Sequence, residues 1–201
     1  MTIKNYIRPI SFLFIIFSLA AAWLFTGTLP PVQAGQQIQP LTIEKAQPGQ
    51  CLRIIKTLER YHYAEKRMDN AMSAIILERY IERLDPGKRI FNQLEITAMK
   101  QYKFRLDDEL KRANLRPAFD IFNLYLKKYA ARIDYQLALI EDWQKRFDFD
   151  QNQFMLIDND LRQWQPDDET LKTLWQKDLK NHIITLLLDG RAPEDITEQL
   201  T

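Results

Sequence analysis

Serine is the residue type in this chain that most directly suggests hydrolytic chemistry, and it is scarce. Beyond the apolar stretch at the N-terminus, Ser73 is the only serine. A catalytic serine needs a base and an oxyanion site nearby, and no glycine-rich turn stands beside Ser73 to expose its hydroxyl. Its apolar neighbours, which include Met72 and Ala74, form a helical pattern in which a serine usually bonds the backbone or packs at a helix contact. We therefore interpret Ser73 as structural and predict no catalytic residue.

Histidine and cysteine are equally sparse, which bears on metal binding. His62 and His182 are the only histidines, and Cys51 is the only cysteine. Zinc sites draw on several His and Cys ligands at short spacings, and neither histidine has such a companion. We interpret His62 as a packed or hydrogen-bonded residue and Cys51 as a small buried apolar residue. The sequence predicts no metal site and, with a single cysteine, no internal disulfide.

An acidic stretch imitates the start of a calcium loop. Asp148, Asp150 and Asn152 alternate as the first ligands of an EF-hand do, but the sixth position is Gln153 instead of glycine. The twelfth position is Asn159, which cannot replace the bidentate glutamate. A solvated acidic loop fits better. The glycines are isolated, so there is no phosphate-binding loop, and we predict no cofactor.

The totals exclude two further classes of protein. The chain holds 28 Lys and Arg against 27 Asp and Glu, and these are interleaved along the sequence. Such a balance gives no electrostatic footprint for nucleic acid. Hydrophobic residues make up 46%, enough for a real core, and charged residues make up 27%, too many for a protein that fills a membrane.

The N-terminus has the features of an export signal. Lys4 and Arg8 precede an apolar run over 10–25, and small residues before Gly35 give a cleavage pattern that ends at Ala34. We therefore predict a signal peptide over 1–34, cleaved between Ala34 and Gly35, and a linker over 35–49. The alternative is an uncleaved leader that anchors the chain in the inner membrane. Either way, the remainder is predicted to be periplasmic.

The rest of the chain is organised around one long stretch, 117–147. Its apolar residues recur with a mean spacing of about 3.6, the period of a helix. Pro117 stands where a first turn begins, and Lys127, Lys128 and Arg132 are expected on the solvent side. The apolar stripe consists of Phe122, Leu126, Tyr129, Ile133, Leu137, Ile140, Trp143 and Phe147.

Helices are also predicted on both sides of this stretch. The first spans 50–63, and the second is capped by Asp69 and stopped by 85–87, with Met72, Ile76, Tyr80 and Leu84 facing inward. A capping box of Asn92 and Glu95 starts a third helix with Met99, Tyr102, Leu106 and Leu110 inward, which Asn114 closes. Another begins with the acidic residues 167–169 and stops at Gly190, and a last one starts at 192–195. Between the long helix and the helix that begins at 167, residues 148–165 form an irregular loop or contain a minor strand at 153–158. The fold class is all-α, a helical bundle over 50–201 around one central helix.

The order of short segments resembles the N-terminal helical domain of the periplasmic tail-specific proteases, also called carboxy-terminal processing proteases. The resemblance covers about 50–201. It is carried by the ordered set Tyr61-His62-Tyr63, Asp69, Ser73, 77–86, Phe104, 106–108, 117–123, Arg132, Tyr135, 164–166, Leu174-Trp175 and Leu179-Lys180.

That resemblance implies a role for the chain. In the family a PDZ domain and a serine/lysine catalytic domain follow, and the helical part shapes the substrate chamber and docks an adaptor lipoprotein. This chain stops inside its last predicted helix and carries neither of those domains, so we expect that it is truncated and that further sequence once followed or still follows. The leading hypothesis is a non-catalytic scaffold with protein substrates or an adaptor as partners. The alternatives are the front part of a full periplasmic serine endopeptidase, or a free periplasmic interaction protein. Whether the chain belongs to an enzyme stays open.

Overall fold

The computed structural model describes residues 39–61 and 67–200. The predicted cleavage site at Ala34 and Gly35 and the predicted packed residue His62 lie outside these ranges. The described residues form helices and contain no strand, which confirms the all-α prediction. The helices are α2 (Gln47–Tyr61), α3 (Asn70–Leu84), α4 (Gln93–Met99), the short 3-10 helix η1 (Lys100–Tyr102), α5 (Leu106–Lys111), α6 (Arg116–Ile140), α7 (Trp143–Arg146), α8 (Asp168–Leu188) and α9 (Pro193–Leu200).

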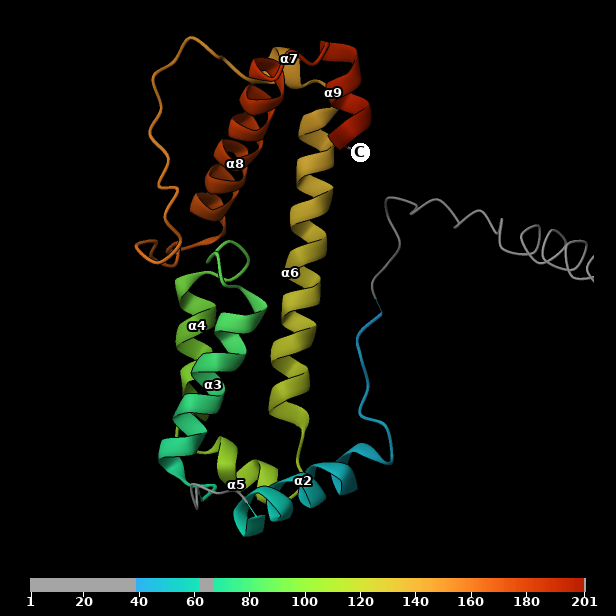
Figure 1. Cartoon of the computed structure of the whole chain (residues 1–201), viewed down its shortest axis with the longest axis vertical. Coiled ribbons are helices and arrows are strands. Elements are labelled where there is room, and N and C mark those ends of the chain that lie inside the picture. The colour runs from blue at the N-terminus through green and yellow to red at the C-terminus, as the bar shows by residue number, and fades with distance from the viewer. Residues whose placement is uncertain (1–38, 62–66, 201) are drawn as a thin grey trace, which may run out of the picture. The chain divides into compact units, whose positions relative to one another are not determined.

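Helix α6 is the element on which the others pack. Helices α3 and α4 lie along its N-terminal half, and α8 lies along its C-terminal half (Figure 1). Helix α5 packs against α3 and α2 at one end, and α9 packs against α8 at the other. Upstream of α2, the backbone N–H and C=O of Leu41 both pair with the side-chain amide of Asn123 on α6, at 2.7 and 3.0 Å. Helix α2 itself begins three residues earlier than predicted, at Gln47.

Two separate hydrophobic clusters form the core. The first joins α3, α4, α5 and the N-terminal half of α6, and the second joins the C-terminal half of α6 with α7, α8 and α9. Because each cluster is made by helices packed on a different half of α6, that helix holds the two together. The buried members of the first are Leu77, Ile81, Phe91, Ile96, Met99, Leu106 and Ile121, and those of the second are Leu139, Ile140, Trp143, Leu179, Ile183, Leu186 and Ile196.

The helix ends follow their local signals closely. The Asp69 side chain accepts from Met72 N, and Asn92 and Glu95 form the predicted capping box. Asp167 caps α8 by accepting from Thr170 N at 2.8 Å. Gly190, with φ +79°, ends α8 in the left-handed region that glycine reaches without strain. The predicted caps at Asp69 and Asn92, the predicted start of α8 and the predicted stop at Gly190 are confirmed because each depends on residues within a few positions of one another.

The predicted length and face of the long helix need correction. It starts at Arg116 with Pro117 in its first turn, as expected, but ends at Ile140, and α7 follows after a break at 141–142. Tyr129 and Ile133 belong to the predicted stripe but are exposed, whereas Ile121 and Lys128 lie outside that stripe and are buried. The reason is that different helices cover α6 along its length, so no single stripe faces the core throughout.

Two predictions for the neighbouring helices also need correction. The third predicted helix is three short pieces: α4 continues directly into η1, and a turn at 103–105 separates η1 from α5. On α3 the most deeply buried residues are Ser73, Leu77 and Ile81, one position beyond the predicted face. Helix α3 is covered on two sides, by α5 and by α6, so its buried arc is wider than one stripe.

A polar layer lies between the two clusters and contains side chains that the sequence placed in solvent. Buried Lys128 holds its ammonium 3.1 Å from Glu95 Oε1 and also pairs with Asp168 Oδ1. The side-chain amide of Asn92 donates to the same Asp168 oxygen at 2.7 Å. Each buried charge is therefore compensated, as burial in a medium of low dielectric constant requires. Lys128 thereby joins α6 to α4 and α8.

A second group of charges completes this layer. Asp178 Oδ2 lies 3.0 Å from Arg89 Nε and 3.7 Å from Arg132 Nη2. The Arg89 contact is within ion-pair distance but outside hydrogen-bond alignment, so its attraction is mainly coulombic. Burial lowers the pKa of Arg132, and Asp178 opposes that shift. Trp175 Nε1 donates to Arg89 O at 2.6 Å and ties α8 to the segment after α3.

Candidate functional site: a pinned apolar loop beside a groove

Two buried cations fix the 148–165 loop from inside. Lys180 on α8 donates to Asp148 O and to Gln153 Oε1, the latter at 3.5 Å. Its ammonium also lies 5.7 Å from the centre of the Phe149 ring. In the described part of the chain no carboxylate pairs with this ammonium, so carbonyl oxygens and a ring face compensate its charge.

The second cation is Arg162, which is also buried. Its guanidinium donates to Gly87 O at 3.2 Å and to Leu156 O, and burial lowers its pKa. Lys88 in turn donates to Arg162 O at 2.5 Å. The loop is therefore held at 148, 153, 156 and 162, although its backbone forms no strand.

Of the two alternatives for 148–165, the irregular loop is confirmed, and the minor strand at 153–158 is wrong. The one bridge involving this region is an isolated parallel contact between Asn92 and Gln165, in which Gln93 N donates to Gln165 O at 2.7 Å. Strands need a partner to satisfy their backbone, and the described residues supply cations at a few points instead of a second strand. The β-prone composition of 153–158 was therefore a misleading signal.

The loop presents large apolar side chains to solvent. Phe154 is 93% exposed and Ile157 is 77% exposed, and Leu156 and Leu161 are exposed as well. Single exposed apolar residues are common on protein surfaces, but four within eight positions on a loop held in place are not. Clusters of this kind mark surfaces that contact another macromolecule. We call residues 154–161 the apolar loop.

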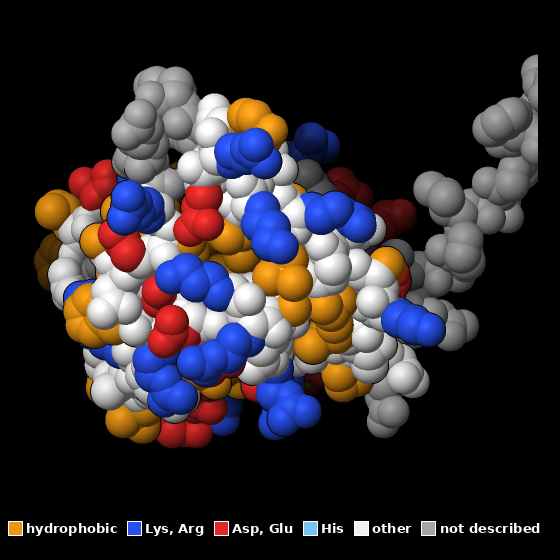
Figure 2. All heavy atoms as spheres, turned by 90° about the horizontal axis from the view of Figure 1, so that it is seen from below, with side chains coloured by type: hydrophobic (Ala, Val, Ile, Leu, Met, Phe, Trp, Pro, Cys, Tyr) orange, Lys and Arg blue, Asp and Glu red, His pale blue; other side chains and the backbone are white. Residues whose placement is uncertain are grey.

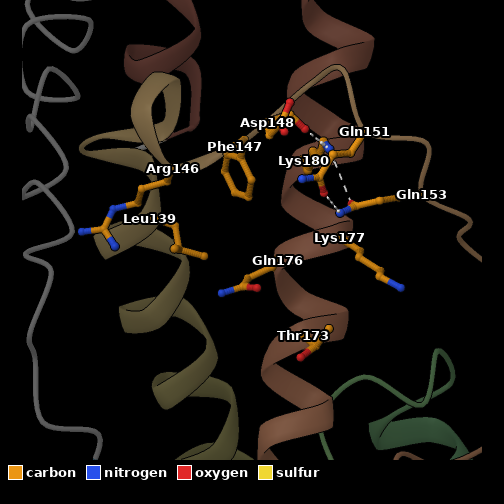
Figure 3. Close-up of a pocket in the computed structure, with 10 residues that line it drawn as sticks. All are labelled: Leu139, Arg146, Phe147, Asp148, Gln151, Gln153, Thr173, Gln176, Lys177 and Lys180. Carbon is orange, nitrogen blue, oxygen red and sulfur yellow. Dashed lines mark hydrogen bonds between the residues drawn. The ribbon is translucent and has the colours of Figure 1, made fainter.

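A groove of about 380 Å³ opens beside the loop, between α6 and α8 (Figure 3). Phe147 and Gln176 point into it, whereas Arg146 and Lys177 point away on opposite sides. Gln176 donates to the Tyr135 hydroxyl at 2.5 Å. The lining combines apolar and carboxamide groups with one carboxylate and three cations, of which Lys180 is committed to loop oxygens and Arg146 and Lys177 point away. No acid and base converge on one point, so the arrangement suits binding and supplies no reacting centre. Its lining residues are Leu139, Arg146, Phe147, Asp148, Gln151, Gln153, Thr173, Gln176, Lys177 and Lys180.

Ser73 has a structural role. It is fully buried, and its hydroxyl oxygen accepts from Leu106 N at 2.9 Å and from Asp107 N at 3.3 Å while donating to Tyr102 O at 3.4 Å. These bonds use the first amide groups of α5, which no residue of that short helix satisfies. A hydroxyl committed to three backbone groups is not placed to attack a substrate.

The other residues singled out in the sequence are dispersed. His182 is exposed on α8, and Cys51 is partly buried on α2, where burial raises the pKa of its thiol. Asp148 accepts from Asp150 N at 3.0 Å, so these acids fold the loop locally. Over 39–61 and 67–200, no group of three or more His, Cys, Asp and Glu residues could hold a metal ion.

Sequence reasoning missed the features that make this surface. Lys180 and Arg162 bind carbonyl oxygens that are distant in the sequence or belong to irregular backbone. No rule of residue spacing predicts such contacts. The apolar run 154–157 is visible in the sequence, but its composition leaves a loop and a minor strand as alternatives and does not indicate exposure. The usable signal was the pair of acidic flanks around an apolar run without a turn that would make a hairpin.

Helices packed around α6, with a buried structural serine among them, define an all-α helical domain. The family described as "Tail specific protease N-terminal domain" matches residues 54–201. The chain belongs to that family.

A curated relative shows how much of such a protein this chain represents. It is similar to the Tail-specific protease of Haemophilus influenzae, with 30% identity over 145 residues. The match covers 72% of this chain and 20% of the relative, so the chain spans about a fifth of that protein's length. Tail-specific proteases are periplasmic proteins. In the described ranges, no helix combines the length and apolar character needed to cross a membrane.

Proposed function

We propose that this chain acts as an exported, non-catalytic helical domain that binds protein partners for tail-specific proteolysis. The observation that carries the proposal is the apolar loop, which is pinned by buried Lys180 and Arg162 on a domain of this family. A surface whose backbone is already ordered loses less conformational entropy on binding. Substrate proteins and an adaptor lipoprotein are the partners that the family suggests.

The test compares three forms of the leaderless chain, residues 35–201. Binding to a purified adaptor lipoprotein and to an unfolded periplasmic substrate is measured by surface plasmon resonance. We expect Phe154→Ser with Ile157→Ser to weaken binding at least about tenfold, as loss of exposed anchors at an interface does. The matched control is Leu188→Ser, which removes an exposed apolar side chain from α8, outside the apolar loop, and should keep full binding.

A peptidase assay on the same preparations probes the non-catalytic part of the proposal. We expect no cleavage of an unfolded substrate above the level of a mock preparation. Cleavage that stays with the purified chain and is lost in Ser73→Ala would overturn it, because a structural serine would then carry chemistry. Equal binding by the loop variant and the control would remove the apolar loop as the contact surface.

A second candidate is that these residues work as the front part of a full periplasmic serine endopeptidase. The observation in its favour is that the chain matches only 20% of its relative. An antibody to residues 50–201 applied to periplasmic extract separates the two. A product below the 23.9 kDa precursor supports a separate domain with its leader removed, and a much larger product supports the front part of a protease.

A further inference from the structure

Helix α2 carries an apolar stripe that the rest of the fold leaves open. Tyr61 is 72% exposed and Ile54 is 59% exposed, and Leu58 between them is exposed too. At 100° per residue these three positions share one side of the helix, adjacent to the side that buries Ile55. The stripe therefore flanks the contact with α5 and continues the apolar half of an amphipathic helix.

The opposite half of α2 is basic. Arg53, Lys56 and Arg60 are exposed and share that side, and Glu59 is the one acidic residue of the helix. The Arg60 guanidinium lies 5.5 Å from the centre of the Tyr61 ring, so it borders the apolar stripe. Apolar and aromatic side chains beside flexible basic ones are the pattern of helices that lie in a membrane interface.

The neighbouring element extends this basic character. Segments 47–61 and 100–116 together hold nine Lys and Arg against four Asp and Glu, while the rest of the chain holds 19 against 23. Within the described residues, the one ion pair of these two segments joins Lys111 to Asp107. Phe104 is exposed here as well, and Lys103 lies 5.3 Å from the centre of its ring. The near-neutral total thus hides a strongly basic end.

Seen from that end, hydrophobic side chains gather in the middle of the face, with Lys and Arg around them and some Asp and Glu between (Figure 2). An anionic lipid surface matches both properties, since it attracts the cations and accepts apolar side chains at the depth of its headgroups. The order of the chain agrees with this occupant. Before cleavage, and in the alternative with an uncleaved leader, only 12 residues, 35–46, separate the leader from α2, and they reach at most about 40 Å from the membrane.

We propose that α2 and the adjoining 100–116 segment form a docking surface for an anionic phospholipid bilayer. Helix α2 lies in the interface with Ile54, Leu58 and Tyr61 among the headgroups, and its basic side chains contact lipid phosphates. Docking is peripheral and reversible, because one short apolar stripe buries little area. The surface is separate from the apolar loop, so lipid binding does not depend on the proposed protein-binding function.

The experiment measures cosedimentation of residues 35–201 with vesicles. This leaderless form is used because residues 37–201 make one compact unit and all members of both hydrophobic clusters follow position 75. Vesicles of mixed phosphatidylglycerol and phosphatidylcholine are compared with pure phosphatidylcholine. We expect clear binding to the anionic vesicles that weakens as salt rises, and little binding to the neutral ones.

Two variants separate this surface from general electrostatics. The triple change Arg53→Glu, Lys56→Glu and Arg60→Glu should lower the partition coefficient about 10- to 100-fold. The matched triple Arg79→Glu, Lys127→Glu and Lys145→Glu changes the net charge equally at exposed positions elsewhere and should lower it far less. Circular dichroism checks that both variants keep their helices.

The result that would overturn the proposal is equal loss of binding in the two triples, or absence of binding by the unaltered chain to anionic vesicles. A further variant, Ile54→Ser with Leu58→Ser, addresses the apolar contribution and should lower vesicle binding several-fold. If the chain binds soluble polyglutamate as well as it binds vesicles, and this variant binds both normally, the surface recognises acidic polymers or proteins and the lipid assignment is wrong.

Discussion

A few buried charged residues hold helices of this structure together. Lys128 sits in a sequence pattern that places it in solvent, yet it is buried against Glu95 and Asp168. Its partners are 33 and 40 positions away, so no local rule identifies them. A charged residue is normally assigned to the solvent side of a helix, and that default fails wherever tertiary contacts supply a counter-charge.

Replacing this lysine tests the cost of breaking the pair. Lys128→Met keeps the length of the side chain but leaves two carboxylates facing each other without a cation. We expect the free energy of unfolding to fall by about 1–3 kcal/mol, below the cost of a fully buried pair because Asp168 is partly exposed. Urea denaturation followed by circular dichroism measures it. Lys127→Met, at the exposed neighbouring position, is the control, and an equal loss there would contradict the assignment.

The same contact predicts a dependence of stability on pH. The hydrogen bond from Lys128 lowers the pKa of Asp168 below its ordinary value of 3.8, and the bond from Asn92 acts in the same direction. A carboxylate whose pKa falls on folding stabilises the native state above the unfolded pKa, and this contribution is lost as pH drops through the folded one. The melting temperature should therefore decline below about pH 4, and more steeply in the unaltered chain than in Asp168→Asn.

The comparison with Asp168→Asn is needed because the pKa of the neighbouring Asp167 is lowered as well. Hydrogen bonds with Thr170 also lower the pKa of Asp167. Unaltered chain and variant share that contribution, so it cancels in the difference between their pH profiles. Parallel profiles would show that Asp168 makes no pH-dependent contribution to stability.

At the scale of elements, the residues at which a helix starts and ends were easier to predict than the helices that pack against it. The caps at Asp69 and Asn92, the acidic start of α8 and the stop at Gly190 depend on four or five consecutive residues, and all of them are confirmed. The break after Ile140 has no proline or glycine to announce it. It coincides with the burial of Trp143, whose indole donates to Thr197 Oγ1 at 3.2 Å.

The candidate surface was the least predictable part for the same reason. Helix boundaries arise from local hydrogen bonds, whereas the loop is held by side chains from α8 and from its own far end. The exposed residues of α2 could be found on a helical wheel, but which side of α2 is covered depends on α5, about 50 residues later.

Two glycines provide a test at this scale. Both Gly49 and Gly190 have open space where a Cβ would stand, but only Gly190 has a positive φ. Gly190→Ala should therefore destabilise by about 1 kcal/mol, and Gly49→Ala, inside α2, should stabilise by up to about 1 kcal/mol. Thermal unfolding of the two variants in parallel measures the opposite signs. Shifts of the same sign would mean that backbone conformation does not decide the effect.

At the scale of the whole described unit, two hydrophobic clusters meet across a polar layer. Helix α6 runs through both, but a helix without packing partners is only marginally stable in water, because most of its stability in a protein comes from tertiary contacts. The charged contacts of Lys128 and Asp178, together with Trp175, connect α6 and α8 to the first cluster. We infer that this layer makes the two clusters unfold together.

Removing the layer should uncouple the clusters. The double variant Lys128→Met with Asp178→Asn eliminates one cation and weakens the attraction to Arg89 and Arg132, while both hydrophobic clusters keep all their members. Hydrogen exchange in increasing urea, followed by mass spectrometry, reports α3 for the first cluster and α9 for the second. In the unaltered chain we expect both to lose protection at one urea concentration, and in the double variant at two. The control Lys127→Met with Glu82→Gln changes exposed charges and should leave a single transition. If the double variant also unfolds in one step at a lower urea concentration, then α6 and the direct packing of α8 carry the cooperativity, and the polar layer only adds stability.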